Sequence, residues 1–336
     1  MSTAPTAVPS AALDAADPAL TTGIRAGLDL VEDRLLAVVP SNHPLLSQTA
    51  GHLARAGGKR VRPMLTLLCS HLGDPSAPAV VDAAVVVELT HLATLYHDDV
   101  MDEAEVRRGA PSANARWTNT IAILTGDFLF ARASELTAGL GTEATFIQSK
   151  TFARLVEGQI AETAGPADGQ DAVEHHLQVI ADKTGSLIAS SARLGALMAG
   201  ASALDVEVAA RFGEVFGVAF QLSDDLIDIA SDSDALGKTP GTDLREGIRT
   251  LPILLVLADT DEPSARLRAL LTGDLSHDDR LAEALGLLRA HPAMDRARLR
   301  LDGYVAEARE IAGQLSSGVT RDALVGLADF VAARTG

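Results

Sequence analysis

The sequence predicts an all-α protein, and two observations carry that prediction. Aromatic residues make up only 3% of the 336 residues while hydrophobic residues make up 47%, and the abundant Ala, Leu, Glu and Arg favour helix over sheet. Apolar side chains also recur mostly three and four positions apart, as in residues 24–39, and no stretch shows convincing β-strand alternation. We therefore expect a single helical domain over residues 23–336, preceded by a disordered tail over residues 1–22.

Glycine and proline residues divide the helical pattern into segments. The helices expected, in order, are residues 24–39, 43–56, 61–73, 77–103, 112–139, 143–163, 171–200, 204–231 and 251–259, with several shorter ones in residues 262–334. Pro252 suits the first turn of the helix in which it lies. A polar, glycine-rich loop over residues 231–250 follows the eighth of these helices, and long loops in compact domains are often active-site lids.

Charge and cysteine content exclude several classes of protein. The net charge of −17 argues against nucleic acid as a partner, because neutralising phosphates requires a basic surface. The single cysteine, Cys69, lies in an apolar stretch and is expected to be a core residue of a cytoplasmic protein. The most apolar long window, residues 186–204, contains Arg193 and several serines, so we expect a buried helix there and no membrane span. No targeting segment is evident.

The spacing Asp-Asp-x-x-Asp occurs twice, each time at the end of an apolar helical stretch. The first motif is Asp98, Asp99 and Asp102, and the second is Asp224, Asp225 and Asp228. Residues i and i+4 lie on one helix face, so the outer two carboxylates of each motif would repel one another without a cation. Oxygen ligands at this spacing suit Mg²⁺, which binds through a few carboxylates, water and substrate phosphates. One motif alone is as readily a surface charge run, but two in the same setting predict a magnesium site.

Basic residues near these motifs are candidates for binding phosphate, because arginine offers a fork of donors and lysine a point charge. The candidates are Lys59, Arg60, Arg62, Arg107, Arg108, Lys183 and Lys238. Those of the stretch "GGKRVRP" stand at a helix start, where backbone N–H groups also attract anions. Each is individually more often a solvated charge, but together with two acidic motifs they predict a site for two phosphorylated groups.

From about Gly51 to Pro252 the sequence resembles the trans-isoprenyl diphosphate synthases, or polyprenyl synthetases, and most of all their long-chain bacterial members. The shared motifs, in the family's order, are "GGKRVRP", "HDDVMD" with "RRG", "GDFLFARA", "DKTG", "FQLSDDLID" and "GKTPGTDLREG". The resemblance implies a helical bundle around a deep central cavity, usually in a homodimer. It also implies an Mg²⁺-dependent prenyltransferase that joins isopentenyl diphosphate to an allylic diphosphate by head-to-tail (1′-4) condensation. We expect at most transient membrane contact, for product release.

The resemblance assigns a role to each matched residue. The metal ligands are Asp98, Asp102, Asp224 and Asp228, with Asp225 assisting. The allylic diphosphate is bound by Arg107, Lys183 and Lys238, with Thr184 and Gln221 lining the reacting region. The isopentenyl diphosphate is bound by Lys59, Arg62, His91 and Arg108. His175 and His176 match no family motif, so we expect both at the surface. Two departures concern the exchange of acid and amide at Gln159 and Glu162, and Ile248 in place of a lysine.

Product length depends on the positions four and five residues before Asp98, where bulky residues stop growth early in the family. Here they are Thr94 and Ala93, which favours a long product of the kind used for a quinone side chain. If Phe128, Phe130 or Phe152 closes the cavity instead, the product is geranylgeranyl or farnesyl diphosphate. A class I terpene cyclase usually lacks a second all-Asp motif, and a non-catalytic partner subunit loses both motifs, so these alternatives fit less well.

Overall fold

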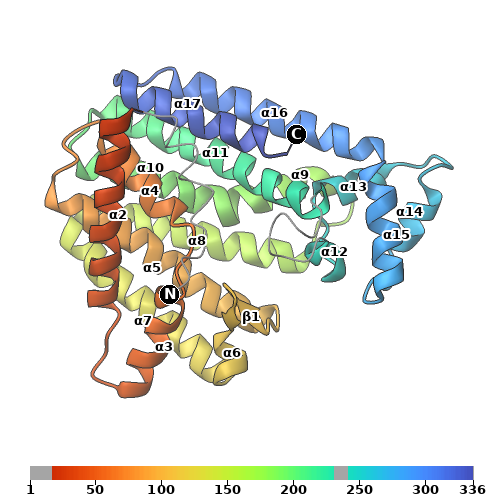
Figure 1. Ribbon diagram of the computed structural model, residues 1–336, viewed down its shortest axis with the longest axis horizontal. Coiled ribbons are helices and arrows are strands. Elements are labelled where there is room, and N and C mark those ends of the chain that lie inside the picture. Colours follow the sequence, from red (N-terminus) through yellow and green to blue (C-terminus); the bar gives the residue numbers. More distant parts are fainter. Residues whose placement is uncertain (1–16, 231–240, 336) are drawn as a thin grey trace. The chain divides into compact units, whose positions relative to one another are not determined.

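The structure is a computed structural model that describes residues 17–230 and 241–335 (Figure 1). The chain divides into two compact units. The first comprises residues 1–153, 187–213 and 311–327, and the second comprises residues 154–186, 214–310 and 328–336. The predicted all-α fold is confirmed. This division into two units does not test the prediction of a single helical domain, which stays a prediction. Residues 1–16 of the expected tail lie outside the described residues.

The helices that lie wholly in the first unit are α2 (Pro18–Val38), α3 (Pro44–Arg55), α4 (Val61–Ser70), α5 (Pro78–Met101), α6 (Ala113–Arg116) and α7 (Asn119–Leu140). Helix α2 begins six residues earlier than expected, because Asp17 accepts hydrogen bonds from the N–H groups of Ala19 and Leu20. Pro18 stands in the first turn of α2, where backbone N–H groups have no partner within the helix, so the N–H that proline lacks costs no hydrogen bond. Residues 18–22 are therefore helical, whereas the sequence predicted a disordered tail.

Helix α5 is the centre of the first unit and packs against α7, α4 and α2, as Figure 1 shows for α5 and α7. By length and composition it is the one helix among the described residues able to cross a membrane, but 67% of its apolar window is buried. It therefore packs as a core helix. Residues 186–204, the window expected to be most apolar, contain a buried helix as predicted, with Leu187, Ile188 and Leu194 at most 1% exposed.

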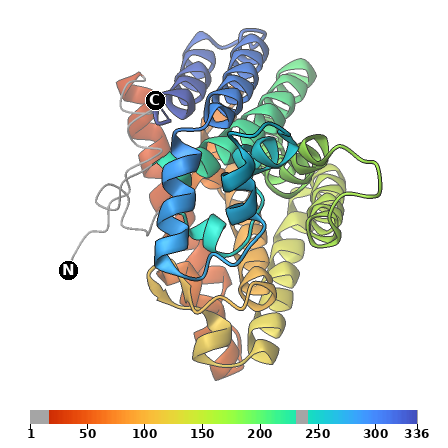
Figure 2. The same ribbon diagram turned by 90° about the vertical axis from the view of Figure 1, so that its right-hand side faces the viewer.

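The remaining helices of the chain are α8 (Thr142–Ala164), α9 (Ala172–Ile180), α10 (Ser186–Met198), α11 (Ala203–Ala230), α12 (Thr242–Arg245), α13 (Leu251–Ala258), α14 (Ala265–Leu271), α15 (Asp278–Arg289), α16 (Pro292–Ala312) and α17 (Gly318–Ala333). In the second unit α13 contacts α9 and α14, and α14 packs beside α15 (Figure 2). Pro252 stands in the first turn of α13, as predicted.

Three local features depart from the predicted elements. A short hairpin of β1 (Val106–Arg107) and β2 (Ala110–Pro111) follows α5, and its two turn residues, Arg108 and Gly109, both have positive φ, as a tight hairpin turn requires. The helix expected over residues 112–139 is interrupted between α6 and α7, where Thr118 accepts a hydrogen bond from the N–H of Ile121. A π-helical segment, η1 (Ala181–Gly185), separates α9 from α10.

Candidate active site

The first aspartate motif lies at the end of α5. Asp98 belongs to the last turn, and Asp102 follows it with its N–H donating to the Asp98 carbonyl at 2.8 Å. Asp98 and Asp102 therefore lie one helical turn apart, as expected. Asp99 points into the core, with its side chain fully buried, and accepts a hydrogen bond of 2.5 Å from Arg107 Nε. Arg107, predicted to bind the allylic diphosphate, thus pairs with its own motif and also lies 4.0 Å from Asp102.

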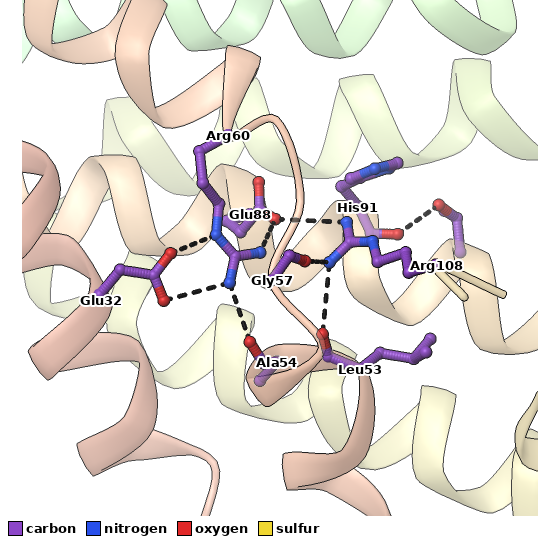
Figure 3. Close-up of polar contacts among 9 residues, drawn as sticks. Glu32, Leu53, Ala54, Gly57, Arg60, Glu88, His91 and Arg108 are labelled. Atoms are coloured by element: carbon purple, nitrogen blue, oxygen red, sulfur yellow. Dashed lines mark hydrogen bonds and ion pairs between the residues drawn. The ribbon is translucent and has the colours of Figure 1, made fainter. Parts of the chain in front are cut away.

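A second cluster in the first unit surrounds Glu88 of α5 (Figure 3). The Glu88 carboxylate accepts from Arg60 Nη1 at 2.5 Å and lies 3.7 Å from Arg108 Nη2. Arg60 also pairs with Glu32 of α2 and donates to the Ala54 carbonyl at 2.9 Å. Sequence reasoning missed both glutamates. The signal was available, because Glu88 is a lone acid in an apolar stretch, and a buried acid requires a partner.

Three of the residues predicted to bind isopentenyl diphosphate, Arg62, His91 and Arg108, lie near this cluster. The fourth, Lys59, has an exposed side chain. Burial lowers the pKa of Arg62 to about 10, and among nearby charges Glu88 and Asp98 oppose this while Arg108 adds to it. Burial also holds the pKa of His91 well below its ordinary value, and Arg62 and Arg108 lower it further. The His91 ring is therefore neutral at pH 7. The first unit thus brings Arg62, His91, Arg108 and Asp98 into one electrostatic neighbourhood.

The second aspartate motif lies on α11, within the second unit. Asp224 pairs with Arg334, near the end of the chain, at 2.8 Å. Asp225 is buried, accepts a hydrogen bond of 2.9 Å from Gln221, and lies 3.7 Å from His176. The expectation that His175 and His176 lie at the surface is wrong. Both rings are partly buried: His175 contacts the Ala161 carbonyl, and His176 faces Asp225.

The π-helical segment carries Lys183 and Thr184, which a sequence motif alone could not place. Lys183 pairs with Glu162 at 2.5 Å, and Thr184 donates to the side-chain oxygen of Gln221 at 3.3 Å. Glu162 is the position where this chain has an acid and the family usually has an amide. The departure from the family pattern therefore supplies the carboxylate that pairs with Lys183. π-helical turns within helices frequently occur at functional sites. Lys238 lies outside the described residues.

The donor chemistry of the two motifs fits a hard divalent cation. Among residues 17–230 and 241–335, no three His, Cys, Asp or Glu side chains form a metal-binding group by themselves. Carboxylate oxygens are nevertheless the ligands that Mg²⁺ prefers, and water and phosphate oxygens complete its shell. The Asp99 Oδ2 atom is buried and has no hydrogen-bond partner. The oxygen donors of the motifs would therefore suit Mg²⁺, with Asp98 and Asp102 available to hold it in the first unit and Asp224 and Asp228 in the second.

Comparison with known proteins identifies the family. The model of the polyprenyl synthetase family matches residues 43–288. The chain belongs to the polyprenyl synthetase family. A nonaprenyl diphosphate synthase of Mycobacterium tuberculosis is 49% identical over 97% of this chain and 98% of that protein. A dimethylallyltranstransferase of the same organism is 41% identical over 95% of this chain and 97% of that protein.

Solved structures agree with this polyprenyl synthetase assignment. A geranylgeranyl pyrophosphate synthase from Corynebacterium glutamicum, complexed with calcium and isoprenyl diphosphate, has a TM-score of 0.85 and 44% identity. The match covers 95% of this chain and 98% of that one. The predictions of a prenyltransferase and of the isoprenyl diphosphate synthase fold are confirmed. The role of each site residue stays a prediction.

Proposed function

We propose that this polyprenyl synthetase is a trans-polyprenyl diphosphate synthase that makes a long-chain product for a quinone side chain. One observation carries the proposal. In the first unit, the buried Arg62 guanidinium lies near enough to Glu88, Arg108 and Asp98 for their charges to act on its pKa, and Arg62 and Arg108 in turn lower the pKa of His91. Buried cationic side chains beside an aspartate motif suit a diphosphate and its metal. The 49% identity to a nonaprenyl diphosphate synthase supports the long product.

Two groups of residues bind the two substrates in this proposal. Lys59, Arg62, His91 and Arg108 bind isopentenyl diphosphate without metal, whereas Arg107, Lys183 and Lys238 bind the allylic diphosphate. The carboxylates of Asp98, Asp102, Asp224 and Asp228 hold Mg²⁺. Bound Mg²⁺ offsets the negative charge that develops on the departing pyrophosphate. The arginine and lysine side chains add to this stabilisation and orient the two substrates, so that proximity supplies much of the rate.

Burial and nearby cations disfavour protonation of His91, so its ring is neutral at pH 7. In this proposal the ring offers the isopentenyl diphosphate a hydrogen bond but no charge. Thr184 and Gln221 contact one another through their side chains and are proposed to line the reacting region. Apolar residues around them exclude water from the allylic cation that forms when the carbon–oxygen bond breaks. The proton lost after condensation passes to the departed pyrophosphate.

A shorter product is the second candidate function, and one contact favours it. Thr90, one turn before Thr94 on α5, is fully buried and accepts a hydrogen bond of 2.6 Å from Gln148 of α8. This contact closes the helix face on which a growing chain would extend. A geranylgeranyl or farnesyl product follows if the contact persists during catalysis.

We also propose that the enzyme acts in the cytoplasm as a homodimer. The buried thiol of Cys69 fits a reducing compartment. Ile123 and Leu124, neighbours near the start of α7, are 42% and 55% exposed, and exposed apolar patches commonly mark protein interfaces. Light scattering on the purified protein tests this, and a monomer at micromolar concentration would exclude the dimer.

One assay tests the activity itself. Purified protein is incubated with labelled isopentenyl diphosphate, each of three allylic primers and Mg²⁺, and the dephosphorylated products are sized by reversed-phase chromatography. We expect a ladder ending in a long-chain product. Cyclic hydrocarbons would indicate a cyclase, and the absence of elongation with every primer would refute the proposal.

A further inference from the structure

The side chain of Glu88 is buried in the first unit, where an ionised carboxylate is stable only with close partners. The residue is 1% exposed, and burying such a charge without a partner is strongly unfavourable. The partners are Arg60 Nη1 at 2.5 Å and Arg108 Nη2 at 3.7 Å. Figure 3 shows these two guanidinium groups reaching Glu88 from two different segments, the turn before α4 and the β1–β2 hairpin.

Both arginines have a left-handed backbone, which non-glycine residues rarely adopt. The φ angles are +48° at Arg60 and +54° at Arg108. Such conformations persist only where surrounding contacts hold them, and they cluster at functional sites. Arg108 is held further by the carbonyls of Leu53, at 3.3 Å, and Gly57. Glu88 therefore lies at the point where two strained segments are fixed to α5.

The donors of Arg60 are already engaged by protein groups. Its Nε bonds Glu32, its Nη1 bonds Glu88, and its Nη2 bonds both Glu32 and the Ala54 carbonyl. Arg60 is consequently a structural link. Its neighbours differ, since Lys59 is exposed and the Nε of Arg62 is buried without a hydrogen-bond partner. The geometry separates one anchoring arginine from the cations available to an anion.

We propose that Glu88 is a positioning residue for the isopentenyl diphosphate site, an inference that rests on the function proposed above. Its carboxylate holds Arg60 and Arg108, and through them it sets where Lys59, Arg62 and the Arg108 guanidinium stand. It also offsets the mutual repulsion of three arginines in one small volume. Glu88 does not touch substrate in this scheme, and it acts through the arginines that it orients.

The test uses Glu88→Gln in the full-length protein, because glutamine keeps the shape and removes the charge. We expect KM for isopentenyl diphosphate to rise roughly tenfold, with KM for the allylic diphosphate changed less than about twofold. Calorimetric binding of isopentenyl diphosphate should weaken by the same factor without any turnover. Glu88→Asp, which keeps the charge but withdraws it by one methylene, should give a smaller rise and serves if the glutamine variant fails to fold.

Asp205→Asn is the matched control. Asp205 is also a buried acid of the first unit, 4% exposed, but its partners are Ser202 and Ser316 rather than arginines. This variant should lower thermal stability and leave both KM values unchanged. Equal changes in the two KM values for Glu88→Gln, or unchanged binding of isopentenyl diphosphate, would overturn the positioning role. A wild-type protein that elongates no primer would refute the proposed function, whereas calorimetry would still decide the role of Glu88.

Discussion

Replacing Thr94 by phenylalanine should shorten the product of this enzyme. Thr94 is half-buried on the same side of α5 as Asp98, four residues earlier. At 1.5 Å per residue this places Thr94 about 6 Å from Asp98 along the helix axis. One extended isoprene unit, four carbon–carbon bonds long, spans roughly 5 Å. A ring at Thr94 therefore blocks the chain at a depth of about one unit, and elongation should stop after roughly two or three units.

The same geometry limits what an unblocked α5 can accommodate. Thr90, bonded to Gln148, lies about 12 Å from Asp98, and the start of α5 at Pro78 lies about 30 Å away. An extended chain of roughly six units therefore reaches the start of α5, and a longer product must bend or pass beyond it. The wild-type enzyme can make a long product only if the chain passes the contact between Thr90 and Gln148.

Thr94 is a cleaner position for this test than Ala93, the other residue predicted to set product length. Ala93 is fully buried, and its carbonyl oxygen would lie only 3.1 Å from a Cβ placed on Gly126 of α7. A phenylalanine at Ala93 would disturb the packing of α5 against α7, so shortened products could reflect lost stability.

The assay compares dephosphorylated products by reversed-phase chromatography after incubation with isopentenyl diphosphate, geranyl diphosphate and Mg²⁺, because a primer of two isoprene units is shorter than a three-unit product. Thr94→Val is the matched control, because it keeps the size of the side chain and removes only the hydrogen bond to the His91 carbonyl. Its product should match that of the wild type. An active Thr94→Phe enzyme whose product keeps its length would refute the reasoning.

Three further predictions concern packing, thiol chemistry and metal. Gly195→Ala should destabilise the protein by roughly 1–3 kcal/mol, because the added Cβ would lie 2.8 Å from the carbonyl carbon of Thr66. At Gly303 an added Cβ meets only open space, so Gly303→Ala should stabilise the protein by up to about 1 kcal/mol. Urea unfolding measures both, and equal effects would contradict the packing argument. Burial raises the pKa of Cys69 to about 12, so a thiol reagent at pH 8 should react only after unfolding, and rapid reaction of the folded protein would show that the site is open. Chelation of divalent ions should abolish elongation and added Mg²⁺ should restore it, whereas full activity in excess chelator would exclude the metal role.

Helix positions followed closely from the sequence, because apolar periodicity records burial directly. The exceptions arise where a side chain overrides periodicity. Asp17 extends α2 towards the N-terminus, and Thr118 interrupts the helix expected over residues 112–139. The π-helical segment at residues 181–185 has no periodic signal, since its neighbours on both sides are helical. One extra residue per turn changes which way Lys183 and Thr184 point without changing the sequence pattern.

The candidate site was predicted by residue type but not by partner. Spacing identified the acids and the cations, because carboxylates and arginines have few other reasons to recur beside apolar helices. Spacing did not reveal that Arg60 is an anchor while Arg62 has an unpaired Nε. That distinction depends on the left-handed backbone of Arg60 and on Glu88, 28 residues away. Contacts at such separations leave no local pattern.

The structure shows that the aspartate carboxylates are not opposed by one another alone. Repulsion within each aspartate motif was the physical reason to expect a bound cation. An outer carboxylate of each motif already has a protein cation nearby, since Arg107 lies 4.0 Å from Asp102 and Arg334 lies 2.8 Å from Asp224. Arg334 lies 110 residues after Asp224 in the chain, so spacing could not show it. Repulsion alone therefore no longer requires a metal. The metal prediction rests on the oxygen donors and on the family, and for Asp224 a metal must share the carboxylate with Arg334 or displace it.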